Sequence, residues 1–257
     1  MKQLKVKITE NKKVARDFYR MRIESGYLAK NSKPGQFVKV KCSEGFEPLL
    51  RRPLGVHRIS NNGIEILYEV VGKGTELLSL KSKGGILDLI GPLGNGFDLL
   101  TAKRPAMLIA GGVGAAPLLC LAQEIAKNKI KPYVIIGAKT SSQVLCEKEF
   151  KKLGCFVSVS TEDGSKGYKG YVTDIMKHLL TIVKCKISGI YACGPFPMLK
   201  AVSYIAASSD VPCQVSMEER MACGVGVCLG CPVKIKKQGY KMVCKDGPVF
   251  NAEDIAW

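Results

Sequence analysis

The sequence predicts a multi-domain β plus α/β protein: an N-terminal antiparallel β-barrel, a doubly wound parallel α/β sheet and a small C-terminal cysteine-rich domain. Three observations predict this class. Short apolar segments are separated by turns up to about residue 98, strand-like and helix-like segments alternate from Arg104, and a Gly/Cys-rich stretch follows Val215. We expect the domains to span residues 1–100, 101–214 and 215–257.

The first domain is expected to be all-β, because its sequence shows no helical period between the strand-like segments. Alternating apolar segments occur at Gln3–Ile8, Phe37–Cys42 and Ile64–Val71, and turn residues occur at 33–35, 61–63 and 84–85. Short strands at this spacing indicate a small antiparallel barrel.

The second domain shows alternating strands and helices. The expected strands are Ala106–Ala110, Tyr133–Gly137, Phe156–Ser160 and Gly189–Cys193, and the expected helices are Pro117–Lys127, Cys146–Lys152, Tyr171–Leu180 and Pro197–Ser208. This alternation indicates a parallel, doubly wound sheet. The last domain contains a hairpin-like pair, Cys231–Lys236 and Tyr240–Cys244, and is too short to bury much core without a metal centre.

The composition excludes several classes of protein. The chain has 39 Lys+Arg against 22 Asp+Glu, a formal charge of +17, but its lysines are scattered and have no aromatic residues interleaved to stack bases. We therefore expect no nucleic-acid partner. The N-terminus has no uninterrupted apolar segment, and glycines and a proline interrupt the most apolar run, Met107–Ala126. We expect a cytoplasmic protein that does not enter a membrane.

The most specific motif is Cys223-x4-Cys228-x2-Cys231-x12-Cys244. Its spacing matches the plant-type [2Fe–2S] ligand order, in which a tight loop supplies three cysteines and a later strand the fourth. The glycines between the cysteines let the backbone wrap closely and direct N–H groups at the sulfurs. A structural zinc site fits the x4 gap less well but stays an alternative, as does a chance cluster of free thiols.

Two segments of the first domain are candidates for phosphate binding. Arg51-Arg52-Pro53-Leu54 stands at a strand end, where an arginine can hold a pyrophosphate with its planar guanidinium group. Gly72-Lys73-Gly74-Thr75 follows one hairpin later as a Gly-rich loop whose backbone N–H groups could approach phosphates. A surface arginine pair and an ordinary turn are the alternative readings.

Three segments of the second domain are candidates for dinucleotide binding. Gly111-Gly112-Val113-Gly114 lies between a strand and a helix, although it is not the G-x-G-x-x-G fingerprint. Glu162, after the third strand, would bind a ribose hydroxyl and favour NAD over NADP. Cys193-Gly194-Pro195 ends the fourth strand, at the edge where α/β sheets bind ligands. A tight strand–helix turn and a solvated acidic turn are the alternatives.

These blocks, in this order, resemble the ferredoxin–NADP reductase-like flavoprotein superfamily. Within it, the chain resembles the electron-transfer subunit of type B dihydroorotate dehydrogenase, the PyrK family. The likeness covers essentially the whole chain. It rests on Arg51–Leu54, Gly111–Gly114, Ala192–Pro195 and, most specifically, on Glu218–Gly224 continuing to Cys244–Phe250.

The resemblance implies FAD on the barrel, NAD on the α/β domain and a [2Fe–2S] cluster at the C-terminus. It implies that Arg52, Pro53, Leu54, Gly55, Leu67, Tyr68, Glu69, Gly74 and Thr75 hold the flavin and that Cys223, Cys228, Cys231 and Cys244 bind iron. It also implies an FMN-containing catalytic subunit, in a heterotetramer of two copies each. Electrons would pass from its FMN through the cluster and FAD to NAD⁺ during pyrimidine biosynthesis. No acid–base pair for substrate chemistry is visible in this chain, which agrees with a relay.

One residue departs from the family pattern. Gly55 stands where the family usually has Ser or Thr after the Arg-Pro-x triplet, so we expect an altered flavin affinity or potential without loss of FAD. Two other functions stay open. A related NAD(P)H-dependent ferredoxin or sulfide oxidoreductase subunit would keep the cofactors, whereas a zinc-stapled binding protein would have neither flavin nor iron.

Overall fold

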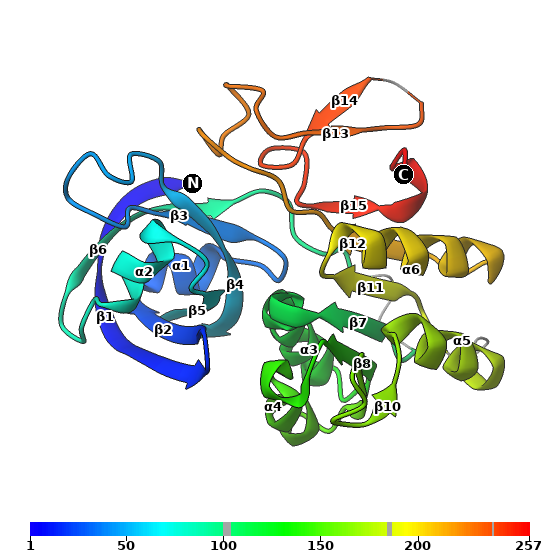
Figure 1. Cartoon of the computed structure of the whole chain (residues 1–257). Helices are drawn as coiled ribbons and strands as arrows, with labels where there is room; N and C mark the ends of the chain where they lie inside the picture. Colours follow the sequence, from blue (N-terminus) through cyan, green and yellow to red (C-terminus); the bar gives the residue numbers. More distant parts are fainter. Residues whose placement is uncertain (100–103, 184–186, 238) are drawn as a thin grey trace.

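The computed structural model describes residues 1–99, 104–183, 187–237 and 239–257 (Figure 1). Within these ranges the chain forms a closed β-barrel, a seven-stranded α/β sheet and a two-stranded hairpin, which confirms the predicted fold class. The expected boundary between residues 100 and 101 lies outside the described residues. The domain boundaries stay predictions.

The barrel is antiparallel throughout, in the order β1-β2-β5-β4-β3-β6. Its strands are β1 (Lys2–Ala15), β2 (Phe18–Glu24), β3 (Phe37–Val40), β4 (Arg52–Ser60), β5 (Gly63–Glu69) and β6 (Ile86–Leu93). Side chains that point inward, among them Ile8, Ile23, Val38 and Val56, pack into one buried core. This alternation of inward and outward residues produces the period of two in the sequence.

Two short helices in the barrel domain contradict the expectation of an all-β domain. Helix α1 (Gly26–Asn31) starts at Ser25, whose hydroxyl accepts a hydrogen bond from the Leu28 N–H at 3.3 Å. Helix α2 (Lys73–Ser79) begins inside the segment that we expected to be an open Gly-rich loop. Both helices are too short to show a helical period in the sequence.

The α/β sheet has the strand order β10-β9-β8-β7-β11-β12-β15. The strands are β7 (Met107–Gly111), β8 (Tyr133–Ala138), β9 (Phe156–Thr161), β10 (Tyr168–Lys169), β11 (Ile190–Cys193), β12 (Cys213–Ser216) and β15 (Val249–Asn251). All neighbouring pairs are parallel except β12 with β15. From β7 the chain builds the sheet outward through β8 and β9 to β10 and then returns to β11 on the other side of β7. The strand order therefore reverses between β7 and β11, the place where such sheets bind ligands.

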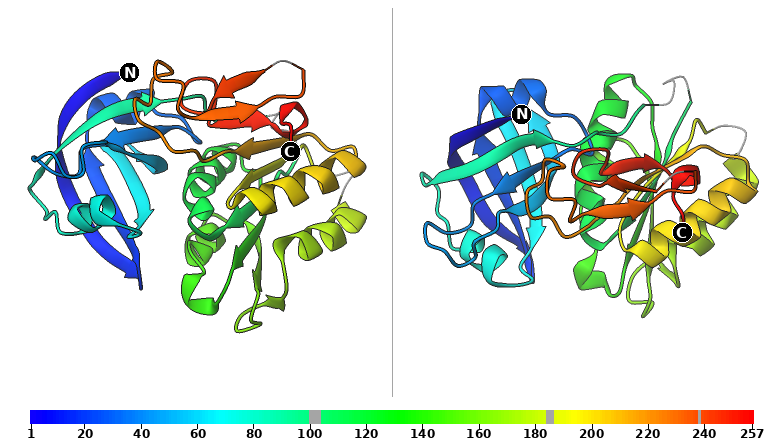
Figure 2. Two further views of the ribbon diagram at one scale, coloured as in Figure 1. Left: turned by 45° about the horizontal axis from the view of Figure 1, so that its top comes forward. Right: turned by 90° about the horizontal axis from the view of Figure 1, so that it is seen from above.

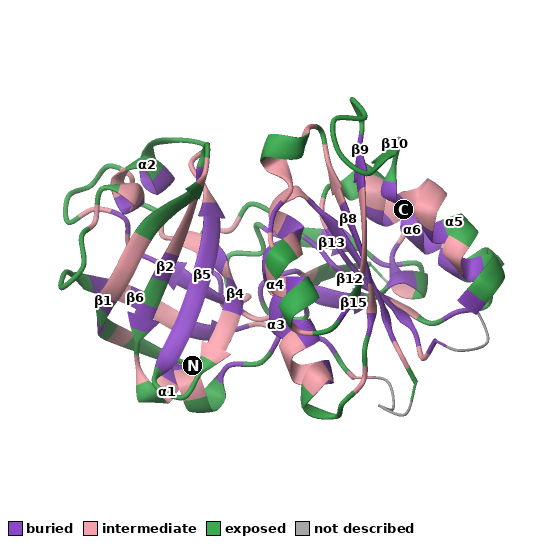
Figure 3. Cartoon of the chain, turned by 90° about the horizontal axis from the view of Figure 1, so that it is seen from below, coloured by how far each residue is buried: buried purple, intermediate pink, exposed green. Residues whose placement is uncertain are grey.

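Helices cover both faces of this sheet (Figure 2). Helices α3 (Ala115–Lys127) and α4 (Glu147–Lys152) pack on one face, and α5 (Val172–Val183) and α6 (Phe196–Ser208) pack on the other. In β7, Met107 and Ile109 face α5 and α6, whereas Leu108 and Ala110 face α3. Successive residues thus enter two different cores, and the central strands β7 and β11 are buried along their whole length (Figure 3). Within the described ranges, no helix is both long and apolar enough to cross a membrane.

The C-terminal segment shares the α/β sheet. Strands β13 (Pro232–Lys234) and β14 (Tyr240–Met242) form the expected hairpin. The next strand, β15, turns back and pairs with β12, with Phe250 opposite Val215. The cysteine-rich segment therefore leaves the sheet at β12 and returns to it at β15.

His57 of β4 connects the barrel with the α/β domain. Its side chain is 1% exposed, and its Nδ1 lies 3.2 Å from the carbonyl oxygen of Ala116 at the start of α3. A neutral imidazole donates this bond. Burial disfavours the imidazolium form and lowers the pKa of His57 to about 4.

We predict that His57 makes the protein less stable in acid. The imidazole of His57 takes up a proton near pH 6.5 in the unfolded chain and near pH 4 in the folded chain. The free energy of unfolding is therefore highest above pH 6.5 and decreases as the pH falls from 6.5 to 4. The expected loss is about 2 kcal/mol between pH 7 and pH 5. In His57→Gln, the difference in melting temperature between pH 7 and pH 5 should shrink. An unchanged difference would contradict the account.

Candidate functional site

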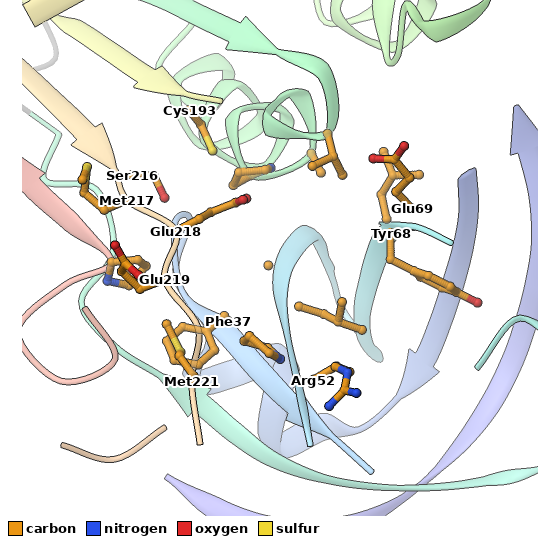
Figure 4. A pocket seen from close by; sticks show the side chains of 18 of the residues that line it. Phe37, Arg52, Tyr68, Glu69, Cys193, Ser216, Met217, Glu218, Glu219 and Met221 are labelled. Carbon is orange, nitrogen blue, oxygen red and sulfur yellow. The ribbon is translucent and has the colours of Figure 1, made fainter. Parts of the chain in front are cut away.

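A cavity of about 370 Å³ lies between the barrel and the carboxyl edge of the α/β sheet (Figure 4). Strands β4 and β5 form the barrel side, and the segments that follow β7, β11 and β12 form the other side. The lining residues are Gly35, Phe37, Arg52, Pro53, Leu54, Gly55, Leu67, Tyr68, Glu69, Val71, Thr75, Val113, Ala116, Pro117, Cys193, Ser216, Met217, Glu218, Glu219, Met221 and Pro248. The structure thus brings most of the expected flavin residues and Cys193 to one site.

The two adjacent arginines have different surroundings. Arg51 binds Asp88 of β6 with both guanidinium ends, Nη1 to Oδ1 at 2.9 Å and Nη2 to Oδ2 at 3.0 Å, and so belongs to the barrel framework. Arg52 lines the cavity and donates to the Leu50 carbonyl at 2.7 Å. It also lies across Gly74, where a Cβ atom would be 2.7 Å from its Nε. Only Arg52 of the pair can therefore meet a phosphate in the cavity.

The remaining barrel residues form the wall of the cavity in different ways. Pro53, Leu54, Gly55, Leu67 and Glu69 line it directly. The ring of Tyr68 points away from it, and the Tyr68 hydroxyl donates to Asn11 Oδ1 at 3.1 Å (Figure 4). The Thr75 hydroxyl donates to the Gly72 carbonyl at 3.1 Å and accepts from the Val71 N–H at 3.0 Å. Thr75 therefore secures the start of α2.

Two glycines of the second domain are close-packing positions. A Cβ atom at Gly111 would lie 2.7 Å from Met198 Sδ and 2.8 Å from Pro195 Cδ. A Cβ atom at Gly114 would overlap the Cys193 carbonyl oxygen. The turns after β7 and β11 therefore pack directly against each other at the reversal of strand order, as small residues there allow.

The other expected dinucleotide residues lie outside the wall of the cavity. Gly112 has a φ of +53° and open space around its Cα, and Gly194 continues the turn after β11. Glu162 is exposed at the end of β9, on the carboxyl edge of the sheet, and its N–H donates to the Ala138 carbonyl at 3.1 Å. With Gly111, Gly114 and Pro195, these residues stay predicted contacts of NAD.

The segment after β12 supplies a cavity wall that the sequence does not predict. Met217, Glu218, Glu219 and Met221 line the cavity, and Glu218 points into it (Figure 4). The surrounding protein limits solvation of the Glu218 carboxylate, and Glu69 adds a like charge, so both raise the pKa of Glu218. The sequence showed that these residues precede Cys223, but it did not show that they turn toward the barrel.

Cys193 lies in the wall of the cavity but is not arranged as a nucleophile. Its thiol is buried. Burial, and to a smaller extent the negative charge of the nearby Glu218, raise the pKa of this thiol. No buried histidine is within the lining residues of this cavity.

The four cysteines of the motif form two pairs. Cys228 approaches Cys223, and its N–H donates to Cys223 Sγ at 3.4 Å. Cys244 approaches Cys231, and its N–H donates to Cys231 Sγ at 3.5 Å. A two-iron cluster requires two thiolates for each iron, and this pairing fits it.

Backbone N–H groups surround the sulfurs, as the glycines in the motif predict. The Val225 N–H donates to Cys223 Sγ at 3.4 Å, and the Gly226 N–H donates to Cys244 Sγ at 3.1 Å. Burial opposes ionisation of Cys223, but the N–H groups of Cys228 and Val225 outweigh it and lower the pKa of the thiol to about 6. Thiolates held by N–H donors are the ligands that an iron–sulfur cluster requires.

The part of the chain that the structure describes offers no site for a single metal ion. Among the described residues, no group of three or more His, Cys, Asp or Glu side chains is arranged to hold one metal ion. The pairs of cysteines favour a two-iron centre over a tetrahedral zinc site.

Family models match two parts of the chain. Residues 218–256 match the iron–sulfur cluster binding domain of dihydroorotate dehydrogenase B, and residues 108–204 match the oxidoreductase NAD-binding domain. The first match contains all four cysteines of the motif, and the second contains the turns after β7, β9 and β11. The zinc-stapled binding protein is therefore set aside.

Curated relatives match almost the whole chain. The dihydroorotate dehydrogenase B (NAD(+)) electron transfer subunit of Desulforamulus reducens is 42% identical over 249 residues, 95% of this chain and 94% of that protein. The protein of the same name from Fusobacterium nucleatum is 41% identical over 253 residues, 96% of each chain.

Solved structures agree on the fold. A chain of the NADH-dependent reduced ferredoxin-NADP oxidoreductase, a flavin-based electron-bifurcating enzyme, has a TM-score of 0.86 and 34% identity, covering 98% of this chain and 90% of that chain. The ferredoxin reductase of carbazole 1,9a-dioxygenase has a TM-score of 0.71 at 20% identity, covers 82% of this chain and 67% of that chain, and supports the fold alone.

These likenesses confirm the resemblance stated from the sequence, and with it the cofactor set of FAD, an iron–sulfur cluster and NAD. The chain therefore belongs to the family of dihydroorotate dehydrogenase B (NAD(+)) electron transfer subunits.

Proposed function

We propose that this chain is the cytoplasmic relay subunit of a complex in which an FMN-containing partner oxidises dihydroorotate to orotate, with two copies of each subunit. The chain would pass the electrons to NAD⁺ and so serve pyrimidine biosynthesis. The observation that carries the proposal is the segment from Met217 to Cys223, which runs directly from the wall of the cavity to the first cysteine of the motif. One short stretch of backbone therefore connects a flavin-sized site with an iron–sulfur site.

The cavity residues fit FAD. Arg52 offers a guanidinium group for the pyrophosphate, and Gly74 leaves room for this side chain. The apolar wall of Pro53, Leu54 and Leu67 suits an aromatic ring system. When bound, FAD exchanges an electron pair with NAD and single electrons with an iron–sulfur cluster.

The α/β domain would bring NAD to the same cavity. The turns after β7 and β11 pack together at the edge of the sheet, and Val113, Ala116 and Pro117 extend from there into the cavity. Glu162 would bind the adenosine ribose. Glu218 and Cys193 would flank the place where nicotinamide meets the flavin.

The cysteine loop presents one edge for the partner subunit. Cys228 is exposed, and the adjacent Val227 and Leu229 are exposed apolar residues, 78% and 65% respectively. Exposed apolar side chains beside a redox centre suit docking of a protein that must bring its own cofactor close. We propose that the partner covers Val227–Leu229.

The direct experiment uses the complex purified anaerobically from its native host. Dihydroorotate and NAD⁺ are added, and NADH formation is followed at 340 nm with and without this subunit. We expect NADH only when the subunit is present. A preparation that retains FAD and cluster and oxidises NADH, but forms no NADH from dihydroorotate, would favour a ferredoxin or sulfide oxidoreductase. The likeness to the ferredoxin-NADP oxidoreductase makes this the second candidate.

Cys228→Ser should separate the two halves of the relay. Loss of one thiolate removes the cluster, so electron passage to the partner should fall to background, whereas NADH oxidation with ferricyanide, which needs only the flavin, should persist. The control is Cys213→Ser, which changes a partly buried cysteine of β12 outside the motif. Wild-type transfer to the partner in Cys228→Ser would show that Cys228 is not a ligand.

Gly55→Ser should restore the hydroxyl that the family usually has at this position. A Cβ atom at Gly55 meets nothing within 4 Å, and Gly55 lines the cavity, so the serine should fit and face the flavin. We expect an unchanged melting temperature and slower release of FAD, because a hydrogen bond adds about 1 kcal/mol.

The matched control for this variant is Gly45→Ser, in which the new Cβ atom also meets nothing within 4 Å, at a position outside the cavity. Flavin release is measured by the rise of FAD fluorescence on dilution. Faster release in Gly55→Ser than in Gly45→Ser would show that the serine obstructs the site.

A further inference from the structure

Lys39 is a buried lysine in the middle of a barrel strand. It lies on β3, opposite Pro53 of β4 and Ile90 of β6, and is 1% exposed. A buried ammonium group is costly unless hydrogen bonds and opposite charges compensate it. The surroundings of Lys39 must therefore supply both.

The hydrogen bonds of Lys39 come from the segment that precedes the first cysteine of the motif. Its Nζ donates to the carbonyl oxygen of Met221 at 3.1 Å and to that of Ala222. Its methylene chain lies against Gly224, where a Cβ atom would overlap it. Gly224 also has a φ of +77°, so both space and backbone conformation require glycine there. Lys39 thus joins the barrel to the backbone on both sides of Cys223.

The charges around Lys39 come mainly from the cysteines. The negative groups that act on the Lys39 ammonium are Cys223, Cys228 and Cys244. Its Nζ lies at the carbonyl oxygens of the two residues that precede Cys223. The nearby Arg51 is compensated by its ion pair with Asp88. The charge of Lys39 is therefore directed at the ligand sulfurs from the barrel side.

We propose that Lys39 is a positioning residue that ties the cluster loop to the flavin barrel and raises the reduction potential of the cluster. The inference rests on the proposed function, because it requires a cluster on the four cysteines. A reduced cluster carries one more negative charge than an oxidised one, and a fixed cation nearby stabilises the reduced form. The same side chain would fix the distance between the cluster and the flavin cavity.

The test compares three variants of the full chain, reconstituted with FAD and cluster. Lys39→Met removes the charge and the donors, Lys39→Gln keeps a donor, and Lys39→Arg keeps both. The midpoint potential of the cluster is measured by a redox titration followed by electron paramagnetic resonance. We expect a more negative potential in Lys39→Met and Lys39→Gln, and a potential nearer to wild type in Lys39→Arg.

The matched control is Lys41→Met, two residues further along the chain. Lys41 has a 34% exposed side chain and pairs with Glu44 at 3.4 Å, so its loss removes the same charge where water screens it. The potential of the Lys41→Met cluster should stay close to wild type. An equal shift in Lys41→Met and Lys39→Met would overturn the proposal, since net charge alone would explain it.

The outcomes distinguish this inference from the proposed function. A cluster in the wild type with an unchanged potential in Lys39→Met overturns the role of Lys39 alone. A wild-type chain that holds no cluster overturns both. If Lys39→Met fails to hold the cluster while Lys39→Arg holds it, the tie between barrel and loop is supported. If Lys39→Met and Lys39→Arg lose the cluster equally, the positive charge at position 39 does not hold the cluster loop and the proposal fails.

Discussion

The cysteine loop must hold its ligands in place without a core of its own. Between β12 and β13 the described chain has neither helix nor strand, and several of its residues have a positive φ, including Gly224, Gly226 and the non-glycine Leu229. The loop is fixed from outside: β12 and β15 hold both ends on the α/β sheet, and Lys39 holds the middle from the barrel. The site depends on this attachment, since free loops are the most mobile parts of a fold.

The flavin cavity depends on the same arrangement of domains. The barrel supplies Arg52 and an apolar wall, and the α/β sheet supplies the turns that follow β7 and β11. The cysteine segment forms the third side of the cavity with Met217, Glu218, Glu219 and Met221. His57 ties β4 to the first turn of α3, where Ala116 also lines the cavity. A change in the angle between barrel and sheet would therefore alter the cavity and the cluster loop together.

Local patterns predicted most of the fold and the iron–sulfur binding segment. The period of two, the alternation of strands and helices, and the spacing of the cysteines each depend on neighbouring residues, so they are visible in a sequence. Lys39 and Glu218 could not be predicted in the same way, because their roles arise from contacts between distant segments. Nothing around Lys39 in the sequence shows that its Nζ reaches Met221. Likewise, β15 is too short for a pattern, and only its pairing with β12 identifies it.

A single chain is expected to connect NAD, flavin and cluster. The most direct measurement is an anaerobic titration of the reconstituted chain with NADH, without its partner, followed by visible absorbance and electron paramagnetic resonance. The account predicts that NADH bleaches the flavin and that the signal of a reduced [2Fe–2S] cluster then appears in the same chain. Bleaching of the flavin without any cluster signal, in protein whose cluster dithionite does reduce, would contradict the account.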